Sequence, residues 1–149
     1  MRLTQHTDYA LRLLIALAVA ARLGDRDTLT IREIAERYAV SRNHLMKVAN
    51  DLTRIGVVEG LRGRGGGLRL AREAAAINIG ALVRMLEDRR DLVECFRPES
   101  NTCLISPACR LKGVLSQAQE AFARVLDDYT LADLVQRPGD LDGLLRLAG

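Results

Sequence analysis

Apolar residues recur at helical spacing along most of the chain, and this pattern predicts a mainly α protein. The first helix is expected over residues 7–23, where Gly24 ends a stretch with one apolar face. That face carries Leu11, Leu14, Ile15 and Ala18. Asp8 and Arg12 are four residues apart in this stretch, so a helix would place both charged side chains on one face.

Two shorter helices with a three-residue turn between them are expected next, which is the pattern of a helix-turn-helix. The first begins with a capping box formed by Thr30 and Glu33, and the turn covers residues 39–41. Ser41 caps the second helix, which ends at Gly56. Its buried face is expected to hold Leu45, Val48, Ala49, Leu52 and Ile55. Near its start we expect these side chains to contact DNA: Ser41, Arg42, Asn43, His44 and Lys47.

A β-hairpin is expected after the helix-turn-helix, which makes the domain a winged one. Residues 57–62 and 68–71 predict two strands, and the glycine-rich residues 63–67 predict the turn between them. Arg62 and Arg64 lie at the tip among glycines, which let the backbone approach a phosphate and let an arginine enter a minor groove. The glycine run is not a P-loop, because it lacks the Lys-Ser/Thr pair and joins two strands.

The second half of the chain predicts a helix from Asn78 and a long helix from Pro107 to about Tyr129. The long helix carries an apolar seam at alternating spacings of four and three, typical of a coiled coil. The seam residues are Leu111, Leu115, Ala118, Phe122, Val125 and Tyr129. A helix of about 23 residues would span roughly 35 Å, more than so small a domain covers well. In one interpretation the helix packs on its own domain; we expect instead an antiparallel or crossed homodimer that forms through this seam.

The end of the chain is expected to hold one more short helix, capped by Thr130 and Asp133, and then a loose tail from Arg137 to Gly149. The expected architecture is mainly α with a small β-hairpin. The expected segments are a winged helix-turn-helix domain over residues 1–77, a cysteine-bearing loop with the dimerisation helix over 78–135, and a tail over 136–149.

Charge divides the chain into two unlike halves. Residues 1–72 hold 13 Lys+Arg against 7 Asp+Glu, whereas residues 73–149 hold 9 against 12. A basic first half indicates an anionic partner for that half alone. The apolar stretch in the first helix is too short to span a membrane, and Asp8 and Arg12 flank or interrupt it, unlike a signal peptide. We therefore expect a cytoplasmic protein with no membrane partner.

Three cysteines within fifteen residues carry the candidate chemistry, and Cys95, Cys103 and Cys109 are the only cysteines in the chain. The third follows Ser106 and Pro107, which predict a helix start with serine as the N-cap. Cys109 would then lie in the first turn of the long helix. Free backbone amides at that end favour the thiolate, which is the form that binds a metal.

Several kinds of site are compatible with three cysteines. They are unrelated small apolar residues in one interpretation, because free cysteine is often buried. A disulfide framework does not fit an odd number of cysteines. Structural zinc usually pairs ligands two to four residues apart, whereas seven and five residues separate these cysteines. An iron–sulfur cluster fits better, because its soft irons prefer thiolates and accept irregular spacing, and three thiolates leave one iron needing a fourth ligand.

These patterns together resemble the family of iron–sulfur winged-helix repressors that includes NsrR and IscR. The resemblance is carried by TDYALRLL, by VSRNHLMKVANDLTRIGVVEGLRGRGGGLRLA and by the three-cysteine loop followed by PACRLKGVL. It covers about residues 1–135. Within the family, ISPACRLKGVLSQAQEAF followed by LDDYTLADL looks most like the NsrR type, the nitric oxide-sensing repressors.

The resemblance implies a homodimer with one iron–sulfur cluster per subunit, with 4Fe–4S favoured over 2Fe–2S, held by the three cysteines. In IscR-like members a histidine three residues after the last cysteine is the fourth ligand, whereas this chain has Lys112 there. In NsrR-like members an aspartate in helix one of the other subunit can be the fourth ligand. Asp8 matches that aspartate, and Arg12 lies beside it around the cluster. Helix one would then contribute to both the dimer and the cluster site.

The function implied by the resemblance is a transcription repressor, not an enzyme. It would bind a palindromic operator in double-stranded DNA and lose it when nitric oxide attacks the cluster. An alternative with the same fold senses iron, cluster supply or redox state. Alternatives from other classes are an iron–sulfur electron carrier, which the helix-turn-helix and wing argue against, and a clusterless or zinc-stabilised DNA-binding protein.

Overall fold

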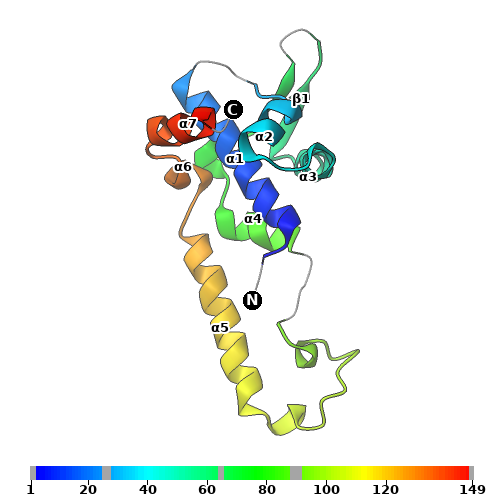
Figure 1. Ribbon diagram of the computed structural model, residues 1–149. Helices are drawn as coiled ribbons and strands as arrows, with labels where there is room; N and C mark the ends of the chain where they lie inside the picture. The colour runs from blue at the N-terminus through cyan, green and yellow to red at the C-terminus, as the bar shows by residue number, and fades with distance from the viewer. Residues whose placement is uncertain (1–2, 25–27, 64–65, 88–91, 148–149) are drawn as a thin grey trace.

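The computed structural model describes residues 3–24, 28–63, 66–87 and 92–147, and it is mainly helical with one β-hairpin (Figure 1). The helices are α1 Gln5–Leu23, α2 Ile31–Tyr38, α3 Arg42–Arg54, α4 Ile79–Leu86, α5 Arg110–Asp127, α6 Leu131–Leu134 and α7 Pro138–Leu147. The strands are β1 Val58–Leu61 and β2 Gly67–Leu70. Three short 3-10 helices complete the order: η1 Ala74–Ala76, η2 Glu94–Phe96 and η3 Ser106–Ala108. No helix in these described ranges is long and apolar enough to cross a membrane.

Helix α1 runs through the middle of the core. It starts at the N-cap Thr4, whose hydroxyl accepts from the backbone N–H of Thr7, and it ends at Gly24 with φ of 70°. Its buried positions extend beyond a single stripe: Ala10, Leu13, Leu14, Ala16, Leu17, Ala18 and Val19. A helix that is apolar on most sides must be covered on most sides, so the other core elements pack around it.

One hydrophobic cluster joins elements from both halves of the chain. Leu52 of α3, Leu82 of α4 and Leu131 of α6 are each 0 % exposed within it. The buried residues of this cluster come from the expected segments 1–77 and 78–135, and Leu141 of the third segment packs against them. Helix α4 and helix α6 complete the winged domain rather than forming a second core.

The predicted helix-turn-helix is present with its predicted caps. Thr30 and Glu33 form the capping box that starts α2, and Ser41 caps α3 by accepting from the backbone N–H of His44. Ala39 ends α2 in the left-handed region with φ of 50°, which turns the chain sharply between the two helices. The face of α3 expected to be buried packs on α1.

The predicted wing is the antiparallel hairpin of β1 and β2, in which Val58 lies opposite Leu70 and Leu61 lies opposite Gly67. Gly63 begins the turn with φ of 96°, a conformation that side chains other than glycine rarely adopt. Two backbone hydrogen bonds of 2.8 and 3.0 Å join Leu68 to Leu29, so the chain before α2 adds a further bridge to the hairpin.

Helix α5 extends away from the core, and the chain before it forms a loop at its far end (Figure 1). It begins at Arg110 and ends at Asp127, so the prediction of a helix from Pro107 to Tyr129 was too long at both ends. Ser106–Ala108 forms a 3-10 turn instead, because Cys109 has an extended backbone that interrupts the helix. We call residues 92–127 the arm, and the other described residues the core.

The prediction of a loose tail is wrong for residues 138–147, which form α7. This helix packs on α1, with Leu145 only 8 % exposed and Leu141 against the core. The short apolar pattern was obscured by Gly139 and Gly143, which are poor helix formers. Packing against α1 supplies the stabilisation that the local sequence lacks.

Candidate nucleic-acid interface and metal centre

The first turn of α3 presents an exposed, cationic surface. Ser41, Arg42, Asn43 and Lys47 are exposed, and no acidic residue lies in the first turn. The free amides of a helix N-terminus attract anions, and the two basic side chains add to that attraction. The N-terminal end of the second helix of a helix-turn-helix is the part expected to contact DNA, and these four residues are exposed there; their contact with DNA stays a prediction.

The fifth predicted DNA contact, His44, is half-buried against α1. Its ring meets Tyr9 edge-on, with 5.0 Å between ring centroids, and lies 6.4 Å from the ring of His6. His6 Nε2 lies 3.1 Å from the Asp51 carboxylate, one turn before the end of α3. Tyr9 and His6 were not predicted as site residues, yet they hold the recognition helix on α1 at two points along its length.

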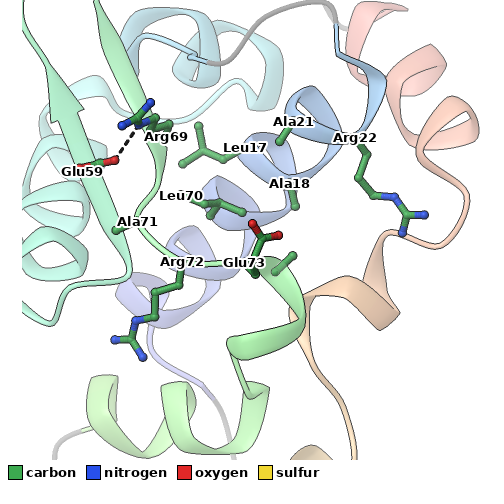
Figure 2. Close-up of a pocket in the computed structure, with 11 residues that line it drawn as sticks. Leu17, Ala18, Ala21, Arg22, Glu59, Arg69, Leu70, Ala71, Arg72 and Glu73 are labelled. Carbon is green, nitrogen blue, oxygen red and sulfur yellow. Dashed lines mark hydrogen bonds and ion pairs between the residues drawn. The ribbon is translucent and has the colours of Figure 1, made fainter.

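Arg62 extends the wing beyond β1 and is exposed. On the same hairpin, Arg69 pairs across the strands with Glu59 at 2.6 Å, as Figure 2 shows, whereas Arg62 makes no ion pair within the part of the chain that the structure describes. Arg62 is therefore available for an anionic partner. Arg64, the other predicted tip residue, lies outside the described residues.

Arg72 is a site residue that was not predicted from the sequence. Its guanidinium donates to the carbonyl oxygens of Gly56 and Ile55, each at 2.9 Å. These carbonyls end α3, so Arg72 fixes the base of the wing to the recognition helix. The wing also contacts α1, where Leu70 lies close to Leu17 beside a hollow of about 710 Å³ (Figure 2). The only indication of this contact in the sequence is that a basic residue directly follows the second predicted strand.

Asp8 and Arg12 form the pair that their spacing predicted. Arg12 Nη2 lies 2.8 Å from Asp8 Oδ2, and Arg12 Nε donates to Asp8 Oδ1 at 3.1 Å. The same guanidinium lies 5.9 Å from the centre of the Tyr9 ring. Both side chains of the ion pair remain 44 % exposed. Asp8 therefore has a partner on its own helix and is still accessible to a second molecule.

A hollow of about 490 Å³ surrounds this ion pair between α1 and the end of α2. Its lining residues are Leu3, Gln5, Asp8, Tyr9, Arg12, Tyr38, Ala39 and Val40. Burial raises the pKa of the Tyr38 phenol, so Tyr38 is a neutral group there at physiological pH. The hollow thus offers one carboxylate, one guanidinium and aromatic walls to whatever docks against α1.

All three cysteines lie in the arm as free, half-buried thiols. Cys95 lies in η2, and the backbone N–H of Cys103 donates to Asn101 Oδ1 at 3.1 Å. Cys109 is the N-cap of α5, so its predicted place inside the first turn is wrong by one position. Ser106, the predicted N-cap, is instead a buried residue of η3.

The structure does not gather these residues into a finished metal site. Within the described ranges, no three Cys, His, Asp or Glu side chains lie close enough together to hold a metal ion. A hollow of about 640 Å³ lies beside Cys109, lined also by Phe96, Ser106, Pro107, Lys112, Gly113 and Ser116. Three free, soft thiols in one short segment fit an iron–sulfur cluster in donor chemistry, although only Cys109 lines the hollow.

The predicted dimer seam is accessible in the single chain. No α5 side chain is buried, and Leu111 is 60 %, Val125 58 % and Tyr129 48 % exposed. Ala118 is exposed, whereas Leu115 and Phe122 are half-buried. Tyr129 lies just beyond the end of α5. An apolar helix face of this length in water is typical of a surface that another chain covers.

Comparison with known proteins identifies relatives over almost the whole chain. The Rrf2 family, described as "Iron-dependent Transcriptional regulator", matches residues 3–137. A protein of Bacillus subtilis (strain 168) named HTH-type transcriptional regulator NsrR is 51 % identical over 147 residues, covering 99 % of each chain. A protein of the same name from Halalkalibacterium halodurans is 49 % identical and also covers 99 % of each chain. The resemblance expected from the sequence is confirmed.

Solved structures confirm the predicted winged-helix fold class. IscR from T. potens superposes with a TM-score of 0.70 at 26 % identity, over 91 % of this chain and 87 % of that chain. CymR, the global cysteine regulator of B. subtilis, superposes with a TM-score of 0.71 at 27 % identity, over 91 % and 97 %.

Proposed function

This chain belongs to the Rrf2 family of transcriptional regulators, and we propose that it is a dimeric repressor that leaves its operator in response to nitric oxide. Its relatives are named as transcriptional regulators, so it is a regulator rather than an enzyme. The observation that carries the proposal is that one chain combines two separate features. The core presents a cationic recognition helix and wing, and the arm carries three free thiols far from them.

DNA recognition is supported by the rigid attachment of both reading elements. Arg72 fixes the wing to the end of α3, and the Tyr9–His44 contact holds the start of α3 on α1. Arg42 and Lys47 are then exposed on a helix whose position is fixed by the contacts of its other face and its end. We propose that α3 enters the major groove and that Arg62 reaches the flanking minor groove.

Dimerisation through α5 is supported by its exposed apolar face. Two copies of one helix pair naturally about a two-fold axis, and a two-fold dimer matches a palindromic operator. In such a dimer the two arms would lie side by side, while the two cores present their α3 helices to successive half-sites.

The cluster proposal assigns the ligands to two subunits. Cys95, Cys103 and Cys109 would hold an iron–sulfur cluster, 4Fe–4S in preference to 2Fe–2S, and Asp8 of the partner subunit would complete it. When bound, an iron–sulfur cluster supplies iron that reacts with nitric oxide. Asp8 lies in the core and the cysteines lie in the arm, so one chain cannot close this site in the conformation described.

Asp8 is suited to act as the exchangeable ligand. A carboxylate is a hard donor, so it binds soft iron less firmly than the thiolates do. Arg12 offers the carboxylate an alternative partner at 2.8 Å on its own helix. Asp8 would therefore either bridge the subunits or pair with Arg12. Because Arg12 lies over Tyr9, and Tyr9 contacts His44, this exchange is adjacent to the recognition helix.

Anaerobic purification followed by iron and sulfide analysis tests the ligand assignment. The unmodified protein should contain both elements and bind a two-fold DNA site. Asp8→Ala should still assemble a cluster on the three thiolates, but its specific DNA binding should fall. Arg12→Ala is the matched control, because it removes the same ion pair and keeps the carboxylate, so a milder defect is expected. Equal behaviour of the two variants would remove Asp8 from the site.

The main alternative is that the protein responds to a signal other than nitric oxide. IscR and CymR share this fold, and CymR is named as a cysteine regulator, so the fold by itself does not specify the signal. A repressor that senses iron, cluster supply or redox state would use the same cysteines. It would release DNA on cluster loss or oxidation and would keep its operator in nitric oxide.

A further inference from the structure

The base of the arm is built where the end of α5 meets the start of α4. The backbone N–H of Ile79 donates to the Tyr129 carbonyl at 2.9 Å, and the N–H of Leu131 donates to the Ile77 carbonyl at 2.8 Å. These two hydrogen bonds form an antiparallel bridge between the residue before α4 and a residue shortly after the end of α5. The chain that directly follows the arm is thus paired with the start of α4.

A single side chain, that of Asn78, caps both helices at this point. Its Oδ1 accepts from the backbone N–H of Ala81 at 2.9 Å, which caps the start of α4. Its Nδ2 donates to the carbonyl of Asp127 at 2.7 Å and to that of Tyr129 at 3.3 Å, which caps the end of α5. Unpaired groups at two helix ends are satisfied by one amide, so the two ends must keep a fixed relative position.

An ion pair adds a second connection. Arg84 donates to the Asp127 carboxylate through both terminal nitrogens, at 2.6 and 3.1 Å. This hydrogen bonding raises the pKa of Arg84. A carboxylate at the C-terminal end of α5 is unfavourable for the dipole of its own helix, but it lies against the N-terminal turn of α4, where negative charge is favoured. The position of Asp127 is therefore explained by α4 and not by α5.

Gly80 makes room for Asp127 against the first turn of α4. It is a buried residue in the first turn of α4. A Cβ at this position would collide with the Asp127 carboxylate and lie 2.8 Å from the Asp127 backbone nitrogen. Glycine is unfavourable inside a helix, so the close approach of α5 accounts for its presence.

We propose that this joint, formed by Asn78, Gly80, Arg84 and Asp127, sets the angle at which α5 leaves the core and thereby the spacing of the two recognition helices on DNA. The inference rests on the proposed function, in which α5 holds the dimer together. Each core is then carried at the end of its own α5. Arg84 and Asp127 act as positioning residues that do not contact DNA.

The joint lies between the dimer helix and the core, so a change there acts on the whole core. With α5 held in the dimer, a tilt at the joint turns the core, and α3 with it, relative to the two-fold axis. The separation of the two α3 helices, which must match the spacing of the half-sites, therefore changes with the angle at the joint.

Variants of the ion pair test this proposal. Arg84→Gln and Asp127→Asn each remove one charge and keep the approximate shape, whereas Arg84→Lys keeps the charge but loses the two-pronged hydrogen bond. Asp128→Asn is the matched control. It removes the neighbouring carboxylate, which makes no hydrogen bond or ion pair among the described residues. Circular dichroism and sedimentation establish that each variant remains helical and dimeric.

The DNA probe is a two-fold site that the unmodified protein selects from a pool of random duplexes. Derivatives have the centre of the site lengthened or shortened by single base pairs, and all are measured at one salt concentration. Arg84→Gln and Asp127→Asn should bind the selected site about tenfold more weakly, and their loss of affinity at the altered sites should be smaller. The difference in affinity between the selected spacing and the altered spacings should therefore decrease. Arg84→Lys should fall between them and the unmodified protein, and Asp128→Asn should match the unmodified protein.

Two results would contradict the proposal. An unchanged spacing preference would show that the joint does not position the recognition helices, and an equal loss at every spacing would mark a general loss of folded protein or of phosphate contacts. Selection of no two-fold site by the unmodified protein would overturn the proposed function, and the joint proposal with it. If the unmodified protein does select a two-fold site, but its affinity depends on half-site spacing in the same way as that of the variants, the joint proposal alone is overturned.

Discussion

The core and the arm of this molecule are stabilised in different ways. The core packs fully buried aliphatic side chains around α1, and Leu13, Leu52 and Leu82 are each 0 % exposed. The arm has almost no interior of its own, and two of its apolar side chains, Leu104 and Ile105, are 96 % and 67 % exposed. The core therefore has a buried interior that stabilises it, whereas the apolar side chains of the arm are left exposed and, in the proposed dimer, would be covered by the partner subunit.

This difference separates two tasks in one short chain. A rigid core keeps α3 and the wing in one arrangement, which reading DNA requires. A projecting arm with free thiols is suited to respond to a signal, because changes there need not disrupt the core. The joint between Arg84 and Asp127 is where the two regions meet.

The largest expected effect of a single substitution is in the core. Leu82→Ala should lower the free energy of unfolding by about 2–5 kcal/mol, because it leaves a cavity at a fully buried site. Leu104→Ala in the arm is the matched control and should change it by less than about 0.5 kcal/mol. Chemical denaturation at one protein concentration measures both. Similar losses for the two variants would contradict the division into core and arm.

A charge on the α5 seam should separate the subunits. Phe122→Asp or Leu115→Asp would bury an unpaired carboxylate in the dimer, at a cost of about 3 kcal/mol or more, and weaken dimerisation roughly hundredfold. Gln117→Asp, outside the seam on the same helix, is the control and should remain dimeric. Sedimentation that finds intact dimers of Phe122→Asp would place the interface elsewhere.

Loss of any one arm thiol should affect the cofactor and spare the core. Cys95→Ser, Cys103→Ser and Cys109→Ser should each lose iron and sulfide while the free energy of unfolding changes by less than about 0.5 kcal/mol. All three are half-buried and lie outside the core cluster. A variant that keeps stoichiometric iron and sulfide would exclude its cysteine from the site. Zinc in anaerobic protein would favour the zinc-stabilised alternative.

The smallest expected effect is a pH dependence just beyond the arm. Thr130 donates to the Asp133 carboxylate from its hydroxyl at 2.7 Å and from its N–H at 2.8 Å, and these bonds lower the pKa of Asp133. The stabilisation is therefore present above the usual aspartate pKa and is lost as pH falls through the lowered value. The unmodified protein should be more stable than Asp133→Asn at neutral pH, and acid should remove the difference. A difference that acid leaves unchanged would contradict this assignment.

The elements that were predicted well from the sequence are those specified by neighbouring residues. The capping boxes at Thr30 and Thr130 and the Asp8–Arg12 pair depend on spacings of three or four residues, and all are present. Helix α7 was missed because its stability comes from packing Leu145 on α1, which no local pattern records.

The same distinction applies to the candidate site. The exposed face of α3 follows from its own amphipathic pattern, so Ser41, Arg42, Asn43 and Lys47 are exposed as expected, whereas His44 is half-buried against Tyr9. Arg72 joins carbonyls 16 and 17 residues earlier, and Arg84 meets a carboxylate 43 residues later, so spacing rules could not reveal either contact. Closure of the cysteines with Asp8 involves a second chain in our proposal, which lies beyond any pattern within one sequence.

In the proposed function, the state of the arm controls the DNA affinity of the core. The sharpest test is an anaerobic titration of the cluster-containing protein with nitric oxide, following visible absorbance and operator binding in the same samples. We predict that the absorbance of the cluster bleaches and operator affinity falls together, with one dependence on the amount of nitric oxide added. Tight operator binding that persists after the cluster has fully reacted would contradict control of the core by the arm.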